Sequence, residues 1–368
     1  MNPISSFLKT VLEWIYALVG NYGWSVILFT VLIRAILLPL DVKSKRGMRA
    51  MSAVQPKMQA LQKKYANDKE KLNQKMNELY RKEKINPMAG CLPMLIQLPI
   101  LFCMFTAMRV VANEETVRMV IEWASHFAEG GYDALVAAAE DTVQDGADGI
   151  NSVLLSWEQI VANGLAENFH PEFQSFLWIK NIYQADSFAT PIMPTVSSLM
   201  SNGLQAVNGT YLTQEHINIA SAFLQSDTYA QLLNHMGMGT DNFTHIDIPF
   251  LITTFTISFP KDWATFTSTA NGLFILPVLA AVSQFVSTLL MPQQQQQQGQ
   301  QQQAGMNNFM KWFFPIFSLF ICATSTAAFS LYWVAVNLIM IVQQQVINWY
   351  FDKKDAAAKN VGEEALKP

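Results

Sequence analysis

One arginine of this 368-residue chain stands inside a long apolar run, where a charged side chain is unfavourable. Arg34 lies within Trp24–Leu40 (WSVILFTVLIRAILLPL), and an arginine at the centre of a bilayer costs about 2.5 to 3.5 kcal/mol on insertion scales. Two explanations stay open. The side chain can snorkel to the headgroups, since Leu40 is six residues or roughly 9 Å away along a helix. Alternatively, it faces a water-filled cavity. No Asp or Glu lies inside the five apolar windows given below, so in that cavity Arg34 would bind negative charge brought by another molecule.

Several uncharged polar residues in the apolar windows are candidates to line the same cavity. Each of them can instead hydrogen bond to a neighbouring helix or backbone carbonyl, and for a single residue that explanation is favoured. They are Gln97, Ser283, Gln284, Ser287, Thr288, Ser330 and Asn337.

Cysteine and histidine show no spacing that suggests catalysis or metal binding. The three cysteines, Cys91, Cys103 and Cys322, each lie in or beside a long apolar run, which argues against a disulfide framework. The five histidines are scattered through the polar middle of the chain, with no HExxH motif and no Cys/His cluster. We therefore expect no metal, no cofactor and no enzymatic reaction.

The composition indicates a membrane protein. Apolar residues make up 51% of the chain and charged residues only 14%, against roughly 25% charged in a soluble domain. Spanning helices need roughly 20 mostly apolar residues. The candidate windows are 24–40, 91–112, 273–291, 312–323 and 329–350. The pattern predicts an all-α polytopic membrane protein with five transmembrane helices.

The distribution of charge predicts the orientation. Between Asp41 and Gly90 there are 13 of the 24 basic residues, with five acidic ones. Between Asn113 and Gly272 there are three basic and 18 acidic residues. Because positive segments stay in the cytoplasm, we expect the first loop and the C-terminus inside and the N-terminus and the long middle region outside. The net charge of −4 also argues against a direct nucleic-acid partner.

The segments between the spans have patterns of their own. Residues 3–19 carry apolar residues at helical spacing, with Lys9 and Glu13 one turn apart, and predict an interfacial helix. Two helical stretches that meet near Asn67 and Asp68 predict a cytoplasmic hairpin with a methionine seam. That seam either packs on itself or is a docking surface for partner helices or lipid. The tract Gln293–Gln303 predicts a disordered linker.

These observations together predict the following organisation along the chain. It comprises an interfacial helix (1–20), the first transmembrane helix (21–41), a cytoplasmic helical hairpin (42–86), the second transmembrane helix (87–112), an enlarged, helical extracytoplasmic region (113–271), the third transmembrane helix (272–291), a Gln-rich cytoplasmic linker (292–308), the fourth and fifth transmembrane helices (309–328 and 329–351) and a cytoplasmic tail (352–368).

Four motifs resemble, in order and spacing, the YidC family of membrane protein insertases. They are NPMAGCLPMLIQLPILFCMF (86–105), FLWI (176–179), LFILPVLAAVSQF (273–285) and LYWVAVNLIMIVQQQVINWY (331–350). The arginine in FTVLIRAILLPL matches the arginine of that family's hydrophilic groove. The resemblance thereby implies a groove role for Arg34, and a lining role for Gln97, Gln284, Ser287, Tyr332 and Trp333.

The resemblance implies a function as well as a fold. It implies a five-helix bundle in the bacterial cytoplasmic membrane, whose groove opens to cytosol and lipid, receives transmembrane segments of newly made proteins and releases them into the bilayer. The implied partners are nascent membrane proteins and lipid, with the Sec translocon and the ribosome as further candidates. No large folded domain precedes the first span, which is typical of the shorter Gram-positive form. The family also usually runs from FLWI almost directly into the third span, whereas some 90 residues intervene here.

Two other classes of function stay open. An assembly factor that holds membrane subunits without inserting them needs the same kind of groove. A channel or transporter would favour paired intramembrane ionisable groups or inverted repeats. The windows hold Arg34 and, near the end of the second, Arg109, with no acidic partner and no evident repeat, which disfavours that class.

Overall fold

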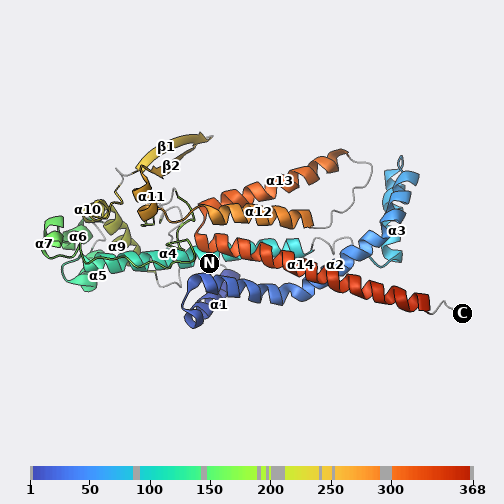
Figure 1. Ribbon diagram of the computed structural model, residues 1–368, viewed down its shortest axis with the longest axis horizontal. Coiled ribbons are helices and arrows are strands. Elements are labelled where there is room, and N and C mark those ends of the chain that lie inside the picture. The colour runs from blue at the N-terminus through green and yellow to red at the C-terminus, as the bar shows by residue number, and fades with distance from the viewer. Residues whose placement is uncertain are drawn as a thin grey trace. The chain divides into compact units, whose positions relative to one another are not determined.

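The computed structural model describes residues 3–85, 92–141, 147–188, 192–195, 199, 212–239, 243–250, 253–290 and 301–364. Over these residues it is mostly helical, with one two-stranded sheet (Figure 1). The chain forms two compact units. Unit 1 comprises Met1–Val26, Cys103–Val278 and Phe320–Leu331, and unit 2 comprises Ile27–Phe102, Leu279–Leu319 and Tyr332–Pro368.

Five helices cover all or most of the predicted apolar windows. They are α2 (Tyr22–Lys64), α4 (Leu92–His126), α12 (Ile275–Leu290), α13 (Gln301–Thr324) and α14 (Ala327–Glu364). Among the described residues, α2 and α14 hold stretches long and apolar enough to cross a membrane, and α12 and the Lys311–Thr324 part of α13 are shorter apolar helices. The mainly helical membrane fold is thus supported, and the number of five spans stays a prediction.

Unit 1 has a helical core of its own. Helices α5 (Gly131–Asp141), α6 (Ala147–Val153), α7 (Trp157–Ala162), α9 (Gln214–Gln225) and α10 (Asp227–His235) gather near the end of α4 (Figure 1). Capping boxes at Ser156 and Thr213 fix the starts of α7 and α9. Their apolar faces meet α4 in one cluster that includes Val117, Val120, Phe127, Leu135, Ile150, Ile160 and Phe223.

One part of unit 1 is not helical, although the sequence predicts a helical region there. Strands β1 (Phe243–Phe250) and β2 (Thr253–Pro260) form an antiparallel hairpin in which Phe243 pairs with Pro260 and Phe250 with Thr253. Helix α11 (Trp263–Thr269) follows, with Asp262 as its N-cap. The physical reason is composition, because Thr, Ile and Phe recur in both strands, and β-branched and aromatic residues favour strands.

The FLWI segment forms a tight turn that holds helix ends together within unit 1. Phe176 and Ile179 pair by two backbone hydrogen bonds, and Leu177 between them takes a positive φ of 55°. The Phe176 ring packs on the start of α2, where a Cβ added to Gly23 would overlap it. The buried Asp186 carboxylate then accepts backbone N–H groups at the beginning of α12 and the indole N–H of Trp178.

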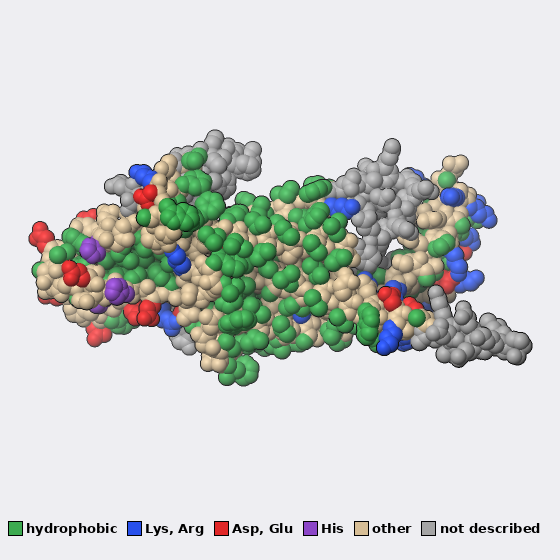
Figure 2. All heavy atoms as spheres, in the orientation of Figure 1, with side chains coloured by type: hydrophobic (Ala, Val, Ile, Leu, Met, Phe, Trp, Pro, Cys, Tyr) green, Lys and Arg blue, Asp and Glu red, His purple; other side chains and the backbone are tan. Residues whose placement is uncertain are grey.

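Unit 2 holds the rest of the five long helices together with α3 (Lys69–Lys82), whose N-cap is Asp68. Figure 2 shows lysine and arginine side chains over α3 and apolar side chains over α12 and α13. Val54 and Met58 of α2 are buried, whereas no residue of α3 is fully buried. The methionine seam is therefore buried along α2 at Val54 and Met58 and half-buried at its other positions on α2 and α3, so its role stays a prediction.

Some helices extend past the predicted boundaries. Helix α2 continues without a break from the first predicted span into the first arm of the hairpin, and α4 runs on to His126. Helix α13 begins at Gln301, inside the stretch predicted as linker, while residues 292–300 of that linker lie outside the described part of the chain. The glutamines at the start of α13 have good helix propensity. The prediction of a disordered linker from low complexity did not take this propensity into account.

Candidate functional site

Arg34 lies on the buried side of α2. Arg34 is 6% exposed, and Phe29 and Thr30, about one turn before it, are also buried. The other side of this part of α2 is exposed, at Leu28, Val31, Leu32 and Ile36. The guanidinium is therefore enclosed by protein, which does not fit a side chain that snorkels to the headgroups. Its Nη2 atom is buried and has no hydrogen-bond partner among the described residues. A buried donor without a partner is unfavourable by about 1 to 3 kcal/mol, so an acceptor that reached this nitrogen would be bound favourably.

Four side chains of unit 2 lie around Arg34 or are linked to it through a neighbour. Tyr332 and Asp41 are both close enough to interact electrostatically with the guanidinium. Gln97 hydrogen bonds to the Tyr332 side chain. Gln343 of α14 donates from Nε2 to Asp41 Oδ2 at 2.8 Å. We call Arg34, Asp41, Gln97, Tyr332 and Gln343 the Arg34 cluster.

Asp41 corrects one expectation from the sequence. Because the apolar windows hold no acidic residue, the sequence predicts that Arg34 has no acidic neighbour of its own. Asp41, the first residue after the window, is such a neighbour. The reason is the helical repeat, because residues seven apart lie on the same face of a helix, two turns away. Pro39 lies between them in α2 and cannot donate a hydrogen bond to the carbonyl of Ala35.

Buried hydroxyl and amide groups form a second polar set within unit 2. Asn337 of α14 donates from Nδ2 to Ser283 Oγ of α12 at 3.2 Å, and both residues are buried. The hydroxyls of Ser287 and Ser318 are buried without a partner among the described residues. Polar atoms buried in this way are normally satisfied by water, so these helices present a hydratable interior rather than a purely apolar one.

The predicted site residues divide into two groups by position. Arg34, Gln97 and Tyr332 come together in the Arg34 cluster. Ser287 is fully buried on α12, and the indole of Trp333 packs against Phe317 of α13 with ring centroids 6.5 Å apart. Gln284 is half-buried on α12, and no hydrogen bond found among the described residues joins it to the Arg34 cluster.

Three polar residues of unit 2 were not predicted by the sequence analysis. Asp41 and Gln343 belong to the Arg34 cluster, and Ser318 adds a buried hydroxyl on α13. The signal for Asp41 was its spacing of seven residues from Arg34. Gln343 stands in the run Gln343–Gln345, and its partner is 302 residues away in sequence, so no local pattern indicates which of these glutamines faces Asp41.

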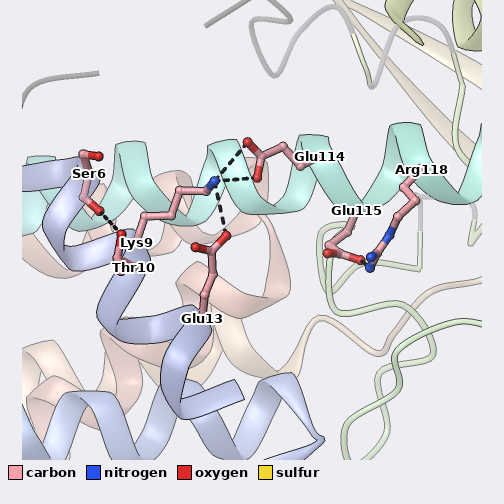
Figure 3. Close-up of polar contacts among 7 residues, drawn as sticks. All are labelled: Ser6, Lys9, Thr10, Glu13, Glu114, Glu115 and Arg118. Carbon is pink, nitrogen blue, oxygen red and sulfur yellow. Dashed lines mark hydrogen bonds and ion pairs between the residues drawn. The ribbon is translucent and has the colours of Figure 1, made fainter. Parts of the chain in front are cut away.

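A charged group also occurs in unit 1, where α1 (Pro3–Val19) meets α4 (Figure 3). Lys9 Nζ lies 2.8 Å and 3.0 Å from the two carboxylate oxygens of Glu114 and 3.2 Å from Glu13 Oε1. Burial by itself lowers the pKa of Lys9, but the hydrogen bond and charge of Glu114, with Glu13, outweigh it and raise that pKa above its usual value. This pairing holds α1 on α4, which is a structural role, and every charge in it has a partner.

Comparison with known proteins identifies the family of the chain. The sequence model of a family described as 60Kd inner membrane protein matches residues 14–354. The membrane protein insertase YidC of Fusobacterium nucleatum is 48% identical over 108 residues, which are 29% of this chain and 53% of that protein. The membrane protein insertase YidC of Bordetella pertussis is 46% identical over 105 residues, 28% of this chain and 19% of that protein. The chain thus aligns with about half or less of the length of these relatives.

Proposed function

Because the chain belongs to the 60Kd inner membrane protein family, to which the YidC proteins belong, we propose that it is a membrane protein insertase. It receives transmembrane segments of newly made proteins from the cytosol in a hydrophilic groove and releases them into the bilayer. No bond is made or broken, so the protein acts as a chaperone for insertion rather than as an enzyme, and it needs no cofactor.

The observation that carries the proposal is the buried guanidinium of Arg34, whose Nη2 atom has no partner among the described residues. A polar tail or loop that crosses a membrane must leave water, and its acidic residues are the most costly part of it. A cation enclosed by protein, with a free N–H donor, compensates an acidic residue during that passage. Arg34 is therefore the transient receptor for negative charge in the substrate, and Gln97, Gln284, Ser287, Tyr332 and Trp333 are proposed to line the same groove.

The hydratable interior of unit 2 serves the same purpose. Ser287 and Ser318 offer hydroxyls, and Ser283 and Asn337 offer an amide–hydroxyl pair, on helices whose outer surfaces are apolar. Water held there shortens the apolar distance that the substrate's polar part must cross. Release follows because the substrate's own apolar segment gains about 0.8 kcal/mol per methylene group that it buries in lipid.

The proposed orientation follows from the distribution of charge. The basic residues of α3 and the second half of α2 stay in the cytoplasm, while the acidic region of unit 1 lies outside. The N-terminus is then external, the C-terminus internal, and five helices span the membrane. Nascent membrane proteins and lipid are the direct partners, and the Sec translocon and the ribosome are proposed as partners that deliver substrates.

The test is insertion by the purified protein in liposomes. Single-span substrates with the same apolar segment carry either acidic or neutral tails, and translocation of the tail is measured by protection from protease. We expect Arg34→Ala to reduce insertion of the acidic-tailed substrate strongly and that of the neutral one weakly. Arg34→Lys should keep part of the activity, because the role needs charge more than a fork of N–H donors. Equal loss for both tails, or no loss, would refute the charge-receptor role.

A matched control is Arg109 on α4. Its guanidinium lies 5.6 Å from the centre of the Phe105 ring, outside the Arg34 cluster. Arg109→Ala removes the same charge from another apolar helix, so it should not change the preference between tails. The same experiment separates the alternatives. An assembly factor would hold substrates without protecting their tails, and a channel would conduct ions without a substrate.

A further inference from the structure

Asp41 is the acidic residue that faces Arg34 from the same helix. The two residues are seven apart on α2, which places them on one face at about 10 Å along the axis. Their charges interact, and the Asp41 carboxylate is held from α14 by the 2.8 Å hydrogen bond of Gln343. Asp41 is half-buried and follows the apolar window on the side of the basic hairpin. It is therefore a fixed negative charge beside the proposed receptor for negative charge.

The two groups do not close into an ion pair. In the described part of the chain, the ion pairs within 4.0 Å do not include Arg34 with Asp41. Arg34 keeps its Nη2 donor without a partner. The carboxylate thus lowers the positive potential at Arg34 and does not itself accept a hydrogen bond from the Nη2 donor.

We propose that Asp41 is a built-in competitor that sets how much negative charge a substrate segment must carry to be held at Arg34. The inference rests on the proposed function of Arg34. A carboxylate from a nascent chain is attracted by the guanidinium and repelled by Asp41. A tail with one acidic residue therefore gains little binding free energy at Arg34, and a tail with two gains more. The same repulsion shortens the stay of the acidic tail, which favours its release toward the outer side.

The size of the effect follows from Coulomb's law. One elementary charge at about 10 Å, in a partly hydrated protein site with an effective dielectric constant of about 20, changes an equilibrium constant on the order of tenfold. Asp41→Asn is nearly isosteric and keeps an acceptor for Gln343. It should therefore raise the retention of a tail with one acidic residue by about tenfold, and leave that of a neutral tail unchanged.

The experiment uses the full chain in liposomes and a series of single-span peptides. Their tails carry zero, one or two glutamates, with glutamine at the other positions, and a photoreactive residue beside them. Retention is the fraction crosslinked to the protein as peptide concentration is varied. Asp41→Glu keeps the charge and should behave like the original chain. Glu78→Gln is the matched control, since it removes one negative charge from an exposed residue of α3 that pairs with Lys75.

The outcomes distinguish this inference from the proposed function. If Arg34→Gln weakens retention of acidic tails while Asp41→Asn behaves like Glu78→Gln, Arg34 is the receptor and the competitor role of Asp41 is overturned. If Arg34→Gln has no selective effect, the proposed function fails. A gain with Asp41→Asn in that case would show simple repulsion by Asp41, which also overturns competition at Arg34. Support requires selective loss with Arg34→Gln, selective gain with Asp41→Asn and no gain with Asp41→Glu.

Discussion

The Asp186 carboxylate offers the sharpest test of what holds the start of α12, which lies in unit 1. It is fully buried, and its Oδ1 accepts the backbone N–H groups of Leu273 at 2.9 Å and Phe274 at 3.1 Å. Its Oδ2 accepts the N–H of Leu276 at 2.7 Å and the indole N–H of Trp178 at 3.1 Å. The two oxygens thus accept hydrogen bonds from four donors. Three of these donors are at the N-terminus of α12, where the helix dipole also favours a negative charge.

Asp186→Asn keeps the shape and removes half of this acceptor capacity. The amide has one oxygen, and its NH₂ group then faces two N–H donors that it cannot bond. Hydrogen bonds to a charged group are worth about 1.5 to 3 kcal/mol each, so losing two of them weakens the start of α12 by about 3 to 6 kcal/mol. Local opening of the segment should then become at least a hundredfold more frequent, since about 1.4 kcal/mol corresponds to a factor of ten.

The assay is hydrogen–deuterium exchange of the purified protein in detergent, followed by mass spectrometry of peptides that cover residues 270–280. We expect faster exchange there in Asp186→Asn, with unchanged exchange in α9. Asp262→Asn is the matched control, because Asp262 is an exposed N-cap of α11 with a 2.7 Å bond from the Thr265 N–H, and Asn is as good an N-cap as Asp. Trp178→Phe removes only one donor and gives a milder variant if Asp186→Asn fails to fold. Unchanged exchange at the start of α12 in both Asp186→Asn and Trp178→Phe would refute the reasoning.

Three further changes test contacts elsewhere in the chain. Lys9→Met leaves the Glu114 carboxylate buried without its partner and should destabilise the protein by about 3 kcal/mol. The double variant Lys9→Met/Glu114→Gln should recover much of that stability, as measured by thermal unfolding. Because the pKa of Lys9 is raised, the pair should persist from neutral pH to about pH 10.4 and be lost as pH rises through that raised value; because burial raises the pKa of Glu114, the pair should also be lost in acid as that carboxylate is protonated. Arg49→Gln removes bonds of 2.6 Å and 3.0 Å to two carboxylates of α14, and should speed proteolysis of the end of α14 by several-fold, whereas Arg49→Lys should do so less. Gly23→Ala overlaps the Phe176 ring and should lower stability by about 1 to 3 kcal/mol, less in a Phe176→Leu background; equal losses in both backgrounds would contradict that contact.

The sequence was most informative where a pattern repeats over several turns. The spacing in residues 3–19 predicts α1, and the structure buries Leu8, Leu12 and Ile15 on one face and pairs Lys9 with Glu13. The break predicted near Asn67 and Asp68 is where α2 ends and Asp68 caps α3. Such features follow from the helical repeat and from capping, which act between residues close in sequence.

The sequence was least informative where residues distant in the chain meet. Asp186 bonds to residues 87 to 90 positions away, and no local pattern distinguishes it from the other acidic residues of the region. The β1–β2 hairpin was missed for a different reason. Two runs of eight residues rich in Thr, Ile and Phe form the strands, but the two residues between them in the sequence, Leu251 and Ile252, are not the Asn, Asp or Gly of a typical hairpin signal. Amphipathic pieces elsewhere in the region led to a helical prediction for all of it.

Arg34 shows that the residues of an apolar window alone do not reveal whether a buried charge has a charged neighbour. The free energy of a charge depends on its neighbours in space, and on a helix these stand three, four and seven residues away. Asp41 lies outside the window but within that reach. With Asp41 nearby, the site's net charge is closer to zero than the arginine alone suggests, so the Nη2 N–H donor of Arg34 contributes to binding beside its charge. A donor of this kind also binds neutral acceptors such as carbonyl oxygens, more weakly than carboxylates. The proposed insertase should therefore hold neutral tails weakly and acidic tails more strongly, rather than accept one class and exclude the other.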